Sequence, residues 1–217
     1  MGHVVASFLR AEKMIIEINP HTPEPRKVRR AVEALEAGNI IAYPTDTVYA
    51  LGCDLANKKA VDRLYQVKGM DKGQPLAFIC PDLADLSKYA IVDNHAYRLL
   101  RRVLPGPYTF VLTATREVPK MLHASERRTV GIRVPDAPII VDVVRALGRP
   151  VISTTAHKPG DEHMVIDARD IEPTFPGVDL ILDGGLGGRD PTTVVDLSHG
   201  SIDILREGAG PVEALVQ

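Results

Sequence analysis

The sequence has no tryptophan, and its 217 residues include only two cysteines, Cys53 and Cys80. Their spacing matches no zinc or redox motif, and a disulfide framework is unusual in a chain of this length, so we expect a reducing compartment. Long hydrophobic runs are also missing, because none approaches the roughly 20 apolar residues that a membrane helix requires. The first residues show no signal-peptide pattern. We therefore expect a cytoplasmic protein without a membrane-spanning helix.

An excess of charge of either sign is absent too. The chain has 26 Lys and Arg against 28 Asp and Glu, a formal net charge of -2, so any nucleic-acid site must be local. Its 45% hydrophobic and 25% charged residues are average for a globular protein. No repeat, linker or low-complexity stretch divides it. This predicts one domain over residues 14–217, after an N-terminal extension at residues 1–13 that is either disordered or upstream of a true start at Met14.

Apolar residues recur alternately at helical spacing and in short buried runs. Four helices are predicted by their start signals, which are Thr22 with Pro23, Asn57, Asp93 and Asp136. Strands are expected at residues 40–43, 76–80, 108–113, 130–134, 151–154, 180–182, 193–197 and 202–206. This alternation predicts a three-layer α/β fold with a large mixed sheet. Polar groups just after the strand ends are then expected to line a common binding rim.

Two basic residues stand out as candidates for a site. Arg133 lies inside the apolar strand at 130–134, where an unpaired guanidinium is costly. Its partner is expected to be an anion, either an Asp or Glu of the chain in a buried ion pair or the anionic group of a ligand. Lys68 precedes a flexible loop that can place ammonium groups over a phosphate, although a basic loop is more often solvated surface.

Hydroxyl-rich segments adjoin several strands. Pro44-Thr45-Asp46-Thr47, residues 153–157 and residues 191–193 offer short side chains that can hold a phosphate or a carboxylate. The alternative for the first segment is an ordinary Asx or Ser/Thr turn. The glycines at 184–188 form neither a Walker loop nor a dinucleotide fingerprint. No histidine cluster has metal-ligand spacing, so we expect no metal held by the protein itself.

Six segments, in this order and spacing, resemble the YrdC/YciO family over about residues 40–210. They are residues 43–52 with Pro44-Thr45-Asp46-Thr47, Lys68 with Pro75-Leu76, residues 104–109, Gly131-Ile132-Arg133-Val134-Pro135, residues 191–196 and residues 205–208. The resemblance implies a twisted, mixed-sheet YrdC-like α/β fold with a positively lined cavity. It also implies the activity of the synthase members, which form L-threonylcarbamoyl-AMP and pyrophosphate from L-threonine, bicarbonate and ATP, with Mg²⁺ accompanying the nucleotide. That product serves the threonylcarbamoyl adenosine modification of tRNA.

The resemblance also implies roles for individual residues. Lys68 is matched to the phosphates and Arg133 to an anionic group of substrate or product, so both are expected to be catalytic. Thr45 and Thr47 are matched to threonine. Further substrate contacts are implied for Thr109, Thr155, His157, Thr192 and Arg206.

Three positions depart from the synthase pattern and bring the sequence closer to the YciO branch. Synthases usually carry Lys-x-Arg and Ser-x-Asn, whereas this chain has Met70 and His157 at the second position of each pair, and Ile79 stands where many members have histidine. A methionine does not replace a bidentate guanidinium, although Lys72 lies in the same loop. The alternative function is therefore a YciO-like protein that binds nucleotide or double-stranded RNA, including tRNA, without efficient synthase activity.

Overall fold

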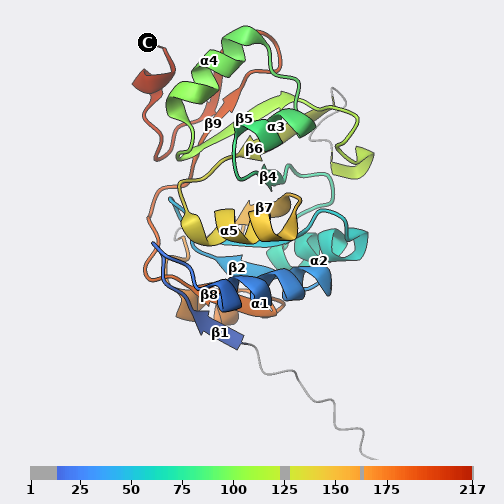
Figure 1. Ribbon diagram of the computed structural model, residues 1–217, viewed down its shortest axis with the longest axis vertical. Helices are drawn as coiled ribbons and strands as arrows, with labels where there is room; N and C mark the ends of the chain where they lie inside the picture. The colour runs from blue at the N-terminus through green and yellow to red at the C-terminus, as the bar shows by residue number, and fades with distance from the viewer. Residues whose placement is uncertain (1–13, 123–127, 162–163, 217) are drawn as a thin grey trace, which may run out of the picture.

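Ten strands of the described chain form one sheet. The computed structural model describes residues 14–122, 128–161 and 164–216, so the predicted extension at 1–13 lies outside the described residues. The strands are β1 (Met14–Glu17), β2 (Ile41–Tyr43), β3 (Ala50–Asp54), β4 (Ala77–Ile79), β5 (Tyr108–Thr113), β6 (Thr129–Arg133), β7 (Val151–Thr155), β8 (Leu180–Asp183), β9 (Thr193–Asp196) and β10 (Asp203–Arg206). Their order in the sheet is β1-β8-β2-β3-β7-β4-β6-β5-β9-β10. Figure 1 shows the sheet running along the long axis of the molecule.

The sheet is mixed and carries helices on both faces. Strands β4 and β6 pair in parallel, as do β5 and β9, whereas β7 is antiparallel to both β3 and β4. The helices are α1 (Pro25–Glu36), α2 (Lys58–Lys68), α3 (Leu83–Tyr89), α4 (Asn94–Val103), α5 (Pro138–Leu147) and α6 (Ile171–Thr174), with 3₁₀ turns η1 (Lys120–Leu122), η2 (Ala168–Asp170) and η3 (Val212–Leu215). The predicted three-layer α/β fold with a large mixed sheet is therefore confirmed. No helix in the described ranges has the length and apolar character that crossing a bilayer requires.

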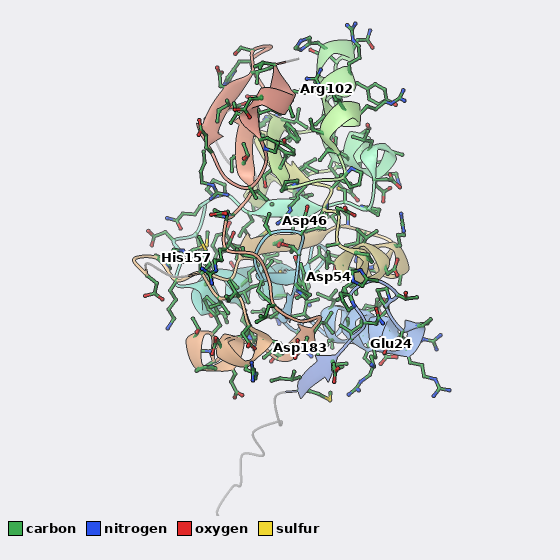
Figure 2. All side chains as sticks on the ribbon, turned by 90° about the vertical axis from the view of Figure 1, so that its left-hand side faces the viewer. Glu24, Asp46, Asp54, Arg102, His157 and Asp183 are labelled. Atoms are coloured by element: carbon green, nitrogen blue, oxygen red, sulfur yellow. The ribbon has the colours of Figure 1, made fainter. Side chains whose placement is uncertain are left out.

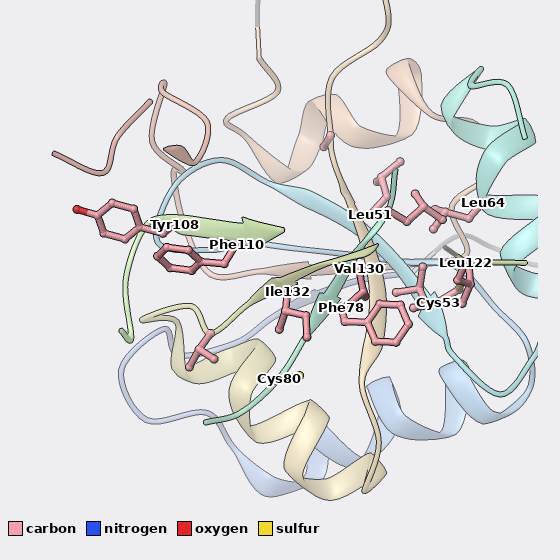
Figure 3. Close-up of a cluster of buried hydrophobic side chains, with 14 of the residues drawn as sticks. Leu51, Cys53, Leu64, Phe78, Cys80, Tyr108, Phe110, Leu122, Val130 and Ile132 are labelled. Atoms are coloured by element: carbon pink, nitrogen blue, oxygen red, sulfur yellow. The ribbon is translucent and has the colours of Figure 1, made fainter. Parts of the chain in front are cut away.

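Two hydrophobic clusters lie on opposite faces of the sheet, because successive side chains of a strand point to opposite sides. Phe78 of β4 belongs to the larger cluster, which also takes in residues of α2, α3 and α4; Figure 3 shows part of this cluster. The next residue, Ile79, belongs to the smaller cluster, in which α1 and α5 pack against β2, β7 and β8. The helices α1 and α5 thus cover the second face over one half of the sheet.

The helix starts were predicted correctly where a polar side chain caps the helix. Asn57 accepts a hydrogen bond from the Ala60 amide at 3.0 Å, and Asp93 accepts one from the Ala96 amide at 2.7 Å. The other two starts were wrong. Helix α1 begins at Pro25 after Glu24, in place of Thr22 and Pro23, and α5 begins at Pro138 after Ala137, in place of Asp136. In both cases a proline holds the first helical position and keeps the residue before it extended.

Two strands, β1 and β3, and two helices, α3 and α6, were not predicted. Strand β1 and both helices are short, and β3 lies in a segment that the sequence suggested was a continuation of the turn after β2. All five residues of β3 are buried, since it pairs with β2 on one side and β7 on the other. A strand buried on both faces shows no alternation of polar and apolar residues, so its sequence lacks the usual signal.

Candidate functional site

A cavity of about 760 Å³ lies on the same face of the sheet as α1 and α5, over the part of that face that these helices leave uncovered. Its floor comes from alternate strand residues, including Ala77 of β4, Gly131 of β6 and Val111 of β5. The residues between them, such as Phe78 and Ile132, point into the larger hydrophobic cluster on the other face. Strand alternation therefore turns one side of each strand toward the core and the other toward the cavity.

Two guanidinium groups and two hydroxyls meet at one end of this cavity, which we call the cationic end (Arg133, Arg206, Thr109 and Thr192). Register places Thr109 of β5 beside Val194 of β9, and the Thr109 and Thr192 hydroxyls are 2.9 Å apart. Arg206 donates from Nη2 to the Thr192 carbonyl at 2.8 Å and to its hydroxyl at 3.1 Å. Partial burial and the nearby Arg133 guanidinium lower the pKa of Arg206.

Arg133 is buried and is bound from behind by the segment Thr45-Asp46-Thr47. Its Nη2 atom forms a short ion pair with Asp46 and donates to the Thr45 and Thr47 hydroxyls at 3.1 and 2.8 Å. Asp46 also accepts a hydrogen bond from the Asp136 amide at 3.2 Å. The Nε atom of Arg133, by contrast, is buried and has no hydrogen-bond partner among the described residues.

Of the two partners that the sequence left open for Arg133, the structure contains the carboxylate of the ion-pair alternative, Asp46. The anionic ligand stays a prediction. The Nε donor is left unsatisfied, and an unpaired buried donor costs about 1–3 kcal/mol. The Asp46 carboxylate neutralises only one of the two guanidiniums, so the cationic end keeps a net positive charge that suits an anion.

Thr45 and Thr47 do not line the cavity, although they were predicted to bind substrate. The Thr45 hydroxyl donates to the Val48 carbonyl at 2.6 Å and accepts from the Thr47 amide at 3.1 Å. This is the hydroxyl turn that the sequence left as the alternative, and it positions the guanidinium of Arg133. Of the other predicted contacts, Thr155 lines the cavity and His157 does not.

Lys68, the second residue expected to be catalytic, points at the backbone and is absent from the cavity wall. Its ammonium donates to the Thr155 carbonyl at 2.7 Å and makes a short hydrogen bond to the His157 carbonyl. It also lies 5.9 Å from the centre of the Phe175 ring. Burial lowers the pKa of Lys68 to about 8. In Figure 2 the loop that carries His157 lies at the side of the molecule, away from Asp46 near the middle.

The residues that depart from the synthase pattern also have definite places. The Met70 sulfur lies 3.7 Å from the hydroxyl of Thr154, which lines the cavity, whereas Met70 itself does not line it. Ile79 lines the cavity and packs in the smaller hydrophobic cluster. Lys72 is exposed and pairs with Asp62 of α2 at 2.8 Å, so it does not replace the missing guanidinium in this arrangement.

The glycines at 184–188 pack against the segment that holds Arg133. Gly188 donates to the Thr47 carbonyl, and a Cβ atom added at Gly188 would lie 2.6 Å from that oxygen. A Cβ atom at Gly184 would meet the Pro44 ring at 2.8 Å. These glycines permit a close backbone approach, and they hold Thr47 in place from the side opposite Arg133.

We expect Gly188→Ala to destabilise the protein by about 1–3 kcal/mol, because overpacking displaces the Thr47 backbone. Gly131→Ala is the matched control, since its added Cβ meets its nearest atom at 3.6 Å, an ordinary contact. Urea unfolding of both variants measures the effect. Equal stability of the two variants would contradict a tight contact between Gly188 and Thr47.

The described residues offer no group of three His, Cys, Asp or Glu side chains that is arranged to hold a metal ion. The Mg²⁺ that the family resemblance implies as the companion of a nucleotide stays an expectation. Sequence reasoning missed Asp46 as the partner of Arg133, and it missed Asp196, Ser198 and His199 as cavity residues. Only the repeated two-residue spacing along β9 signals that Asp196 shares a face with Val194.

Comparison with known proteins places the chain in a family. The family model Sua5/YciO/YrdC, described as "Telomere recombination", matches residues 33–208. Escherichia coli YciO, an uncharacterized protein, is 42% identical over 197 residues, which cover 90% of this chain and 96% of that one. Its crystal structure matches with a TM-score of 0.89 over 94% of this chain and 99% of that one, at 40% identity.

Threonylcarbamoyl-AMP synthases are more distant relatives. The Mus musculus enzyme is 34% identical over 189 residues, which cover 83% of this chain and 66% of the enzyme. The structure of P. abyssi Sua5 complexed with L-threonine matches with a TM-score of 0.85 at 29% identity, over 92% of this chain and 59% of that one. The six segments identified in the sequence and the fold shared with these structures indicate the same family. The chain is therefore a member of the Sua5/YciO/YrdC family.

Proposed function

We propose that this protein is an L-threonylcarbamoyl-AMP synthase, which forms threonylcarbamoyl-AMP and pyrophosphate from L-threonine, bicarbonate and ATP for the modification of tRNA. Membership of a family that includes threonylcarbamoyl-AMP synthases supports the reaction. The observation that carries the proposal for this chain is the cationic end, where Arg133 and Arg206 line a cavity of about 760 Å³ together with Thr109 and Thr192. That end suits one carboxylate or one phosphate group.

The residues of the cationic end would act mainly by position and charge. A threonine carboxylate bound between Arg133 and Arg206 would make charge-assisted hydrogen bonds, and the Thr109 and Thr192 hydroxyls lie beside the same place. The amino group would then extend over the floor of the cavity, where it condenses with bicarbonate to a carbamate with loss of water. Attack of the carbamate oxygen on the α-phosphorus expels pyrophosphate and places charge on phosphate oxygens, which positive groups stabilise in a partly dry site.

Production of AMP or pyrophosphate from ATP tests the proposal directly. We expect turnover that requires both L-threonine and bicarbonate, and that falls sharply in Arg206→Met. Arg169→Met is the matched control, because Arg169 is an exposed arginine paired with Asp167 and lies outside the cavity. Turnover that is independent of threonine, or unaffected by the loss of Arg206, would contradict the proposal.

A second candidate function is a nucleotide-binding protein without efficient synthase activity. Two observations favour it: the Lys68 ammonium is bound by backbone carbonyls, and an uncharged residue, Met70, contacts the hydroxyl of Thr154. Neither residue then offers a free positive charge to a triphosphate. The two candidates differ in whether the chain turns over ATP at all.

Met70→Arg is expected to raise threonine-dependent AMP formation by about tenfold to hundredfold, because a charge-assisted phosphate contact contributes about 1.5–3 kcal/mol. Lys72→Ala is the control from the same loop, and we expect little change because Lys72 pairs with Asp62. Steady-state assays of both variants measure the effect. If Met70→Arg leaves an active parent unchanged, the phosphates do not lie near this loop. Absence of turnover in both proteins would favour the binding protein.

A further inference from the structure

The cavity has a second polar end that the cationic end does not explain. Asp196, Ser198 and His199 line it there, and we call these three residues the acidic end. Along β6, Arg133 and Thr129 both line the cavity and are four residues apart. At a rise of about 3.3 Å per residue, the cavity therefore extends over roughly 13 Å along this strand. Strand β9 runs parallel to β5, so Asp196 lies level with Val111 and Gly131, two residues or about 7 Å along the strands from the row of Thr109 and Arg133, and Ser198 follows further along.

Asp196 is an acceptor held in a fixed position. One of its carboxylate oxygens accepts a hydrogen bond from the Ser198 amide at 2.7 Å, and the other lies 3.8 Å from His199 Nε2. Its side chain is 16% exposed. Among the described residues that line the cavity, Asp196 is the only carboxylate. The two ends of the cavity therefore have opposite chemistry, with donors and positive charge at one and an acceptor at the other.

The floor of the cavity beside Asp196 is mostly apolar. Ala77, Gly131 and Val111 lie in the same register row as Asp196 and contribute small or aliphatic surfaces there. A Cβ atom added at Gly131 would meet neighbouring atoms no closer than 3.6 Å, so the floor has room for one methyl group without distortion of the sheet. Such a surface suits the apolar face of a ring.

We infer that the acidic end is a subsite for the hydrogen-bond donor of an elongated ligand, the threonylcarbamoyl-AMP of the proposed reaction, whose threonine carboxylate lies at the cationic end. Asp196 is then a specificity-determining residue. The inference rests on the proposed function, in which the ligand contains a nucleoside. Two parts of a nucleoside supply such a donor, namely the exocyclic amino group of the base and the hydroxyls of the ribose. A ligand without a donor at this distance leaves the carboxylate unsatisfied and binds more weakly.

Calorimetric titration of the Asp196→Asn variant with AMP and, separately, with L-threonine tests the inference. Asparagine keeps an oxygen for the Ser198 amide but loses the negative charge. We expect AMP affinity to fall about tenfold, the scale of one charge-assisted hydrogen bond, while threonine affinity stays within about twofold. Asp203→Asn is the matched control, because Asp203 faces Asp196 in the register of β9 and β10 but lies outside the cavity.

Two further ligands identify the donor. If the base supplies it, IMP binds the parent as weakly as AMP binds Asp196→Asn; if the ribose supplies it, 2′-deoxy-AMP does so. Gly131→Ala provides an independent check, since one added methyl on the floor should weaken AMP binding without loss of stability.

The inference is overturned if Asp196→Asn binds AMP as tightly as the parent does, or if the parent does not bind AMP. It is also overturned if the substitution lowers the affinity for threonine as much as the affinity for AMP. These outcomes differ from failure of the proposed function. A parent that binds AMP through Asp196 but forms no product contradicts the synthase and leaves the inference intact. If the parent forms product and the Asp196→Asn variant binds AMP as tightly as the parent does, only the inference is contradicted.

Discussion

Replacement of Arg133 by methionine is expected to weaken L-threonine binding by about tenfold to hundredfold. The guanidinium is buried at the cationic end, and its Nε atom has no hydrogen-bond partner among the described residues. A hydrogen bond to a charged group contributes about 1.5–3 kcal/mol, which corresponds to this loss of affinity. Titration calorimetry with threonine measures it, and Arg133→Lys is expected to recover only part because an ammonium lacks the planar fork.

The Arg133→Met variant alone does not separate binding from folding. It leaves the Asp46 carboxylate, whose side chain is 10% exposed, without its partner, and loss of one member of a buried ion pair costs about 3–5 kcal/mol. We therefore expect Arg133→Met/Asp46→Asn to recover most of the stability and none of the threonine affinity. Recovery of affinity in the double variant would mean that Arg133 serves only the fold.

The need of Arg133 for an anionic partner was accessible from the sequence, because a charge inside an apolar strand is costly without one. Its actual partner was not. Asp46 lies 87 positions earlier in the chain, in a segment that also fits an ordinary turn. Which carboxylate pairs with a buried arginine depends on which loop lies beside the strand end, and that is a property of the sheet order. The sequence alone does not specify an order such as β7-β4-β6-β5.

The contacts of Lys68, Thr45 and Thr47 were not predicted for a similar reason, because they too depend on tertiary structure. Residue type indicates what each side chain can bind, but backbone carbonyls and amides are identical at every position and give no sequence signal. Lys68 is held by the carbonyls of Thr155 and His157, and Thr45 by the carbonyl of Val48. Local signals were sufficient for most helices and strands. The competing partners of polar side chains were not, because they are supplied by tertiary structure.

Lys68→Met is expected to cost little stability at pH 7 and progressively more toward pH 10. Burial lowers the pKa of Lys68 to about 8 from an ordinary value of 10.5, so the folded state disfavours the ammonium. At pH 7 the two hydrogen bonds to carbonyls are offset by the cost of the buried charge. At higher pH the neutral amine still donates to the Thr155 carbonyl and no longer carries that cost.

The sign follows from proton binding. Between pH 8 and 10.5 the unfolded chain keeps a proton on this lysine that the folded chain has lost, so stability rises with pH in that window, by up to about 1.4 kcal/mol per unit. Burial raises the pKa values of Cys53 and Cys80, which contribute the opposite slope. The measurement is therefore the difference in unfolding free energy between the parent and Lys68→Met, from urea denaturation at pH 7, 8, 9 and 10. A difference that is constant with pH would mean that the lysine is not buried as described.

Proton uptake when ATP binds at pH 8.5, present in the parent and absent in Lys68→Met, would instead show that the amine leaves the carbonyls and takes the phosphate role that the family resemblance implies.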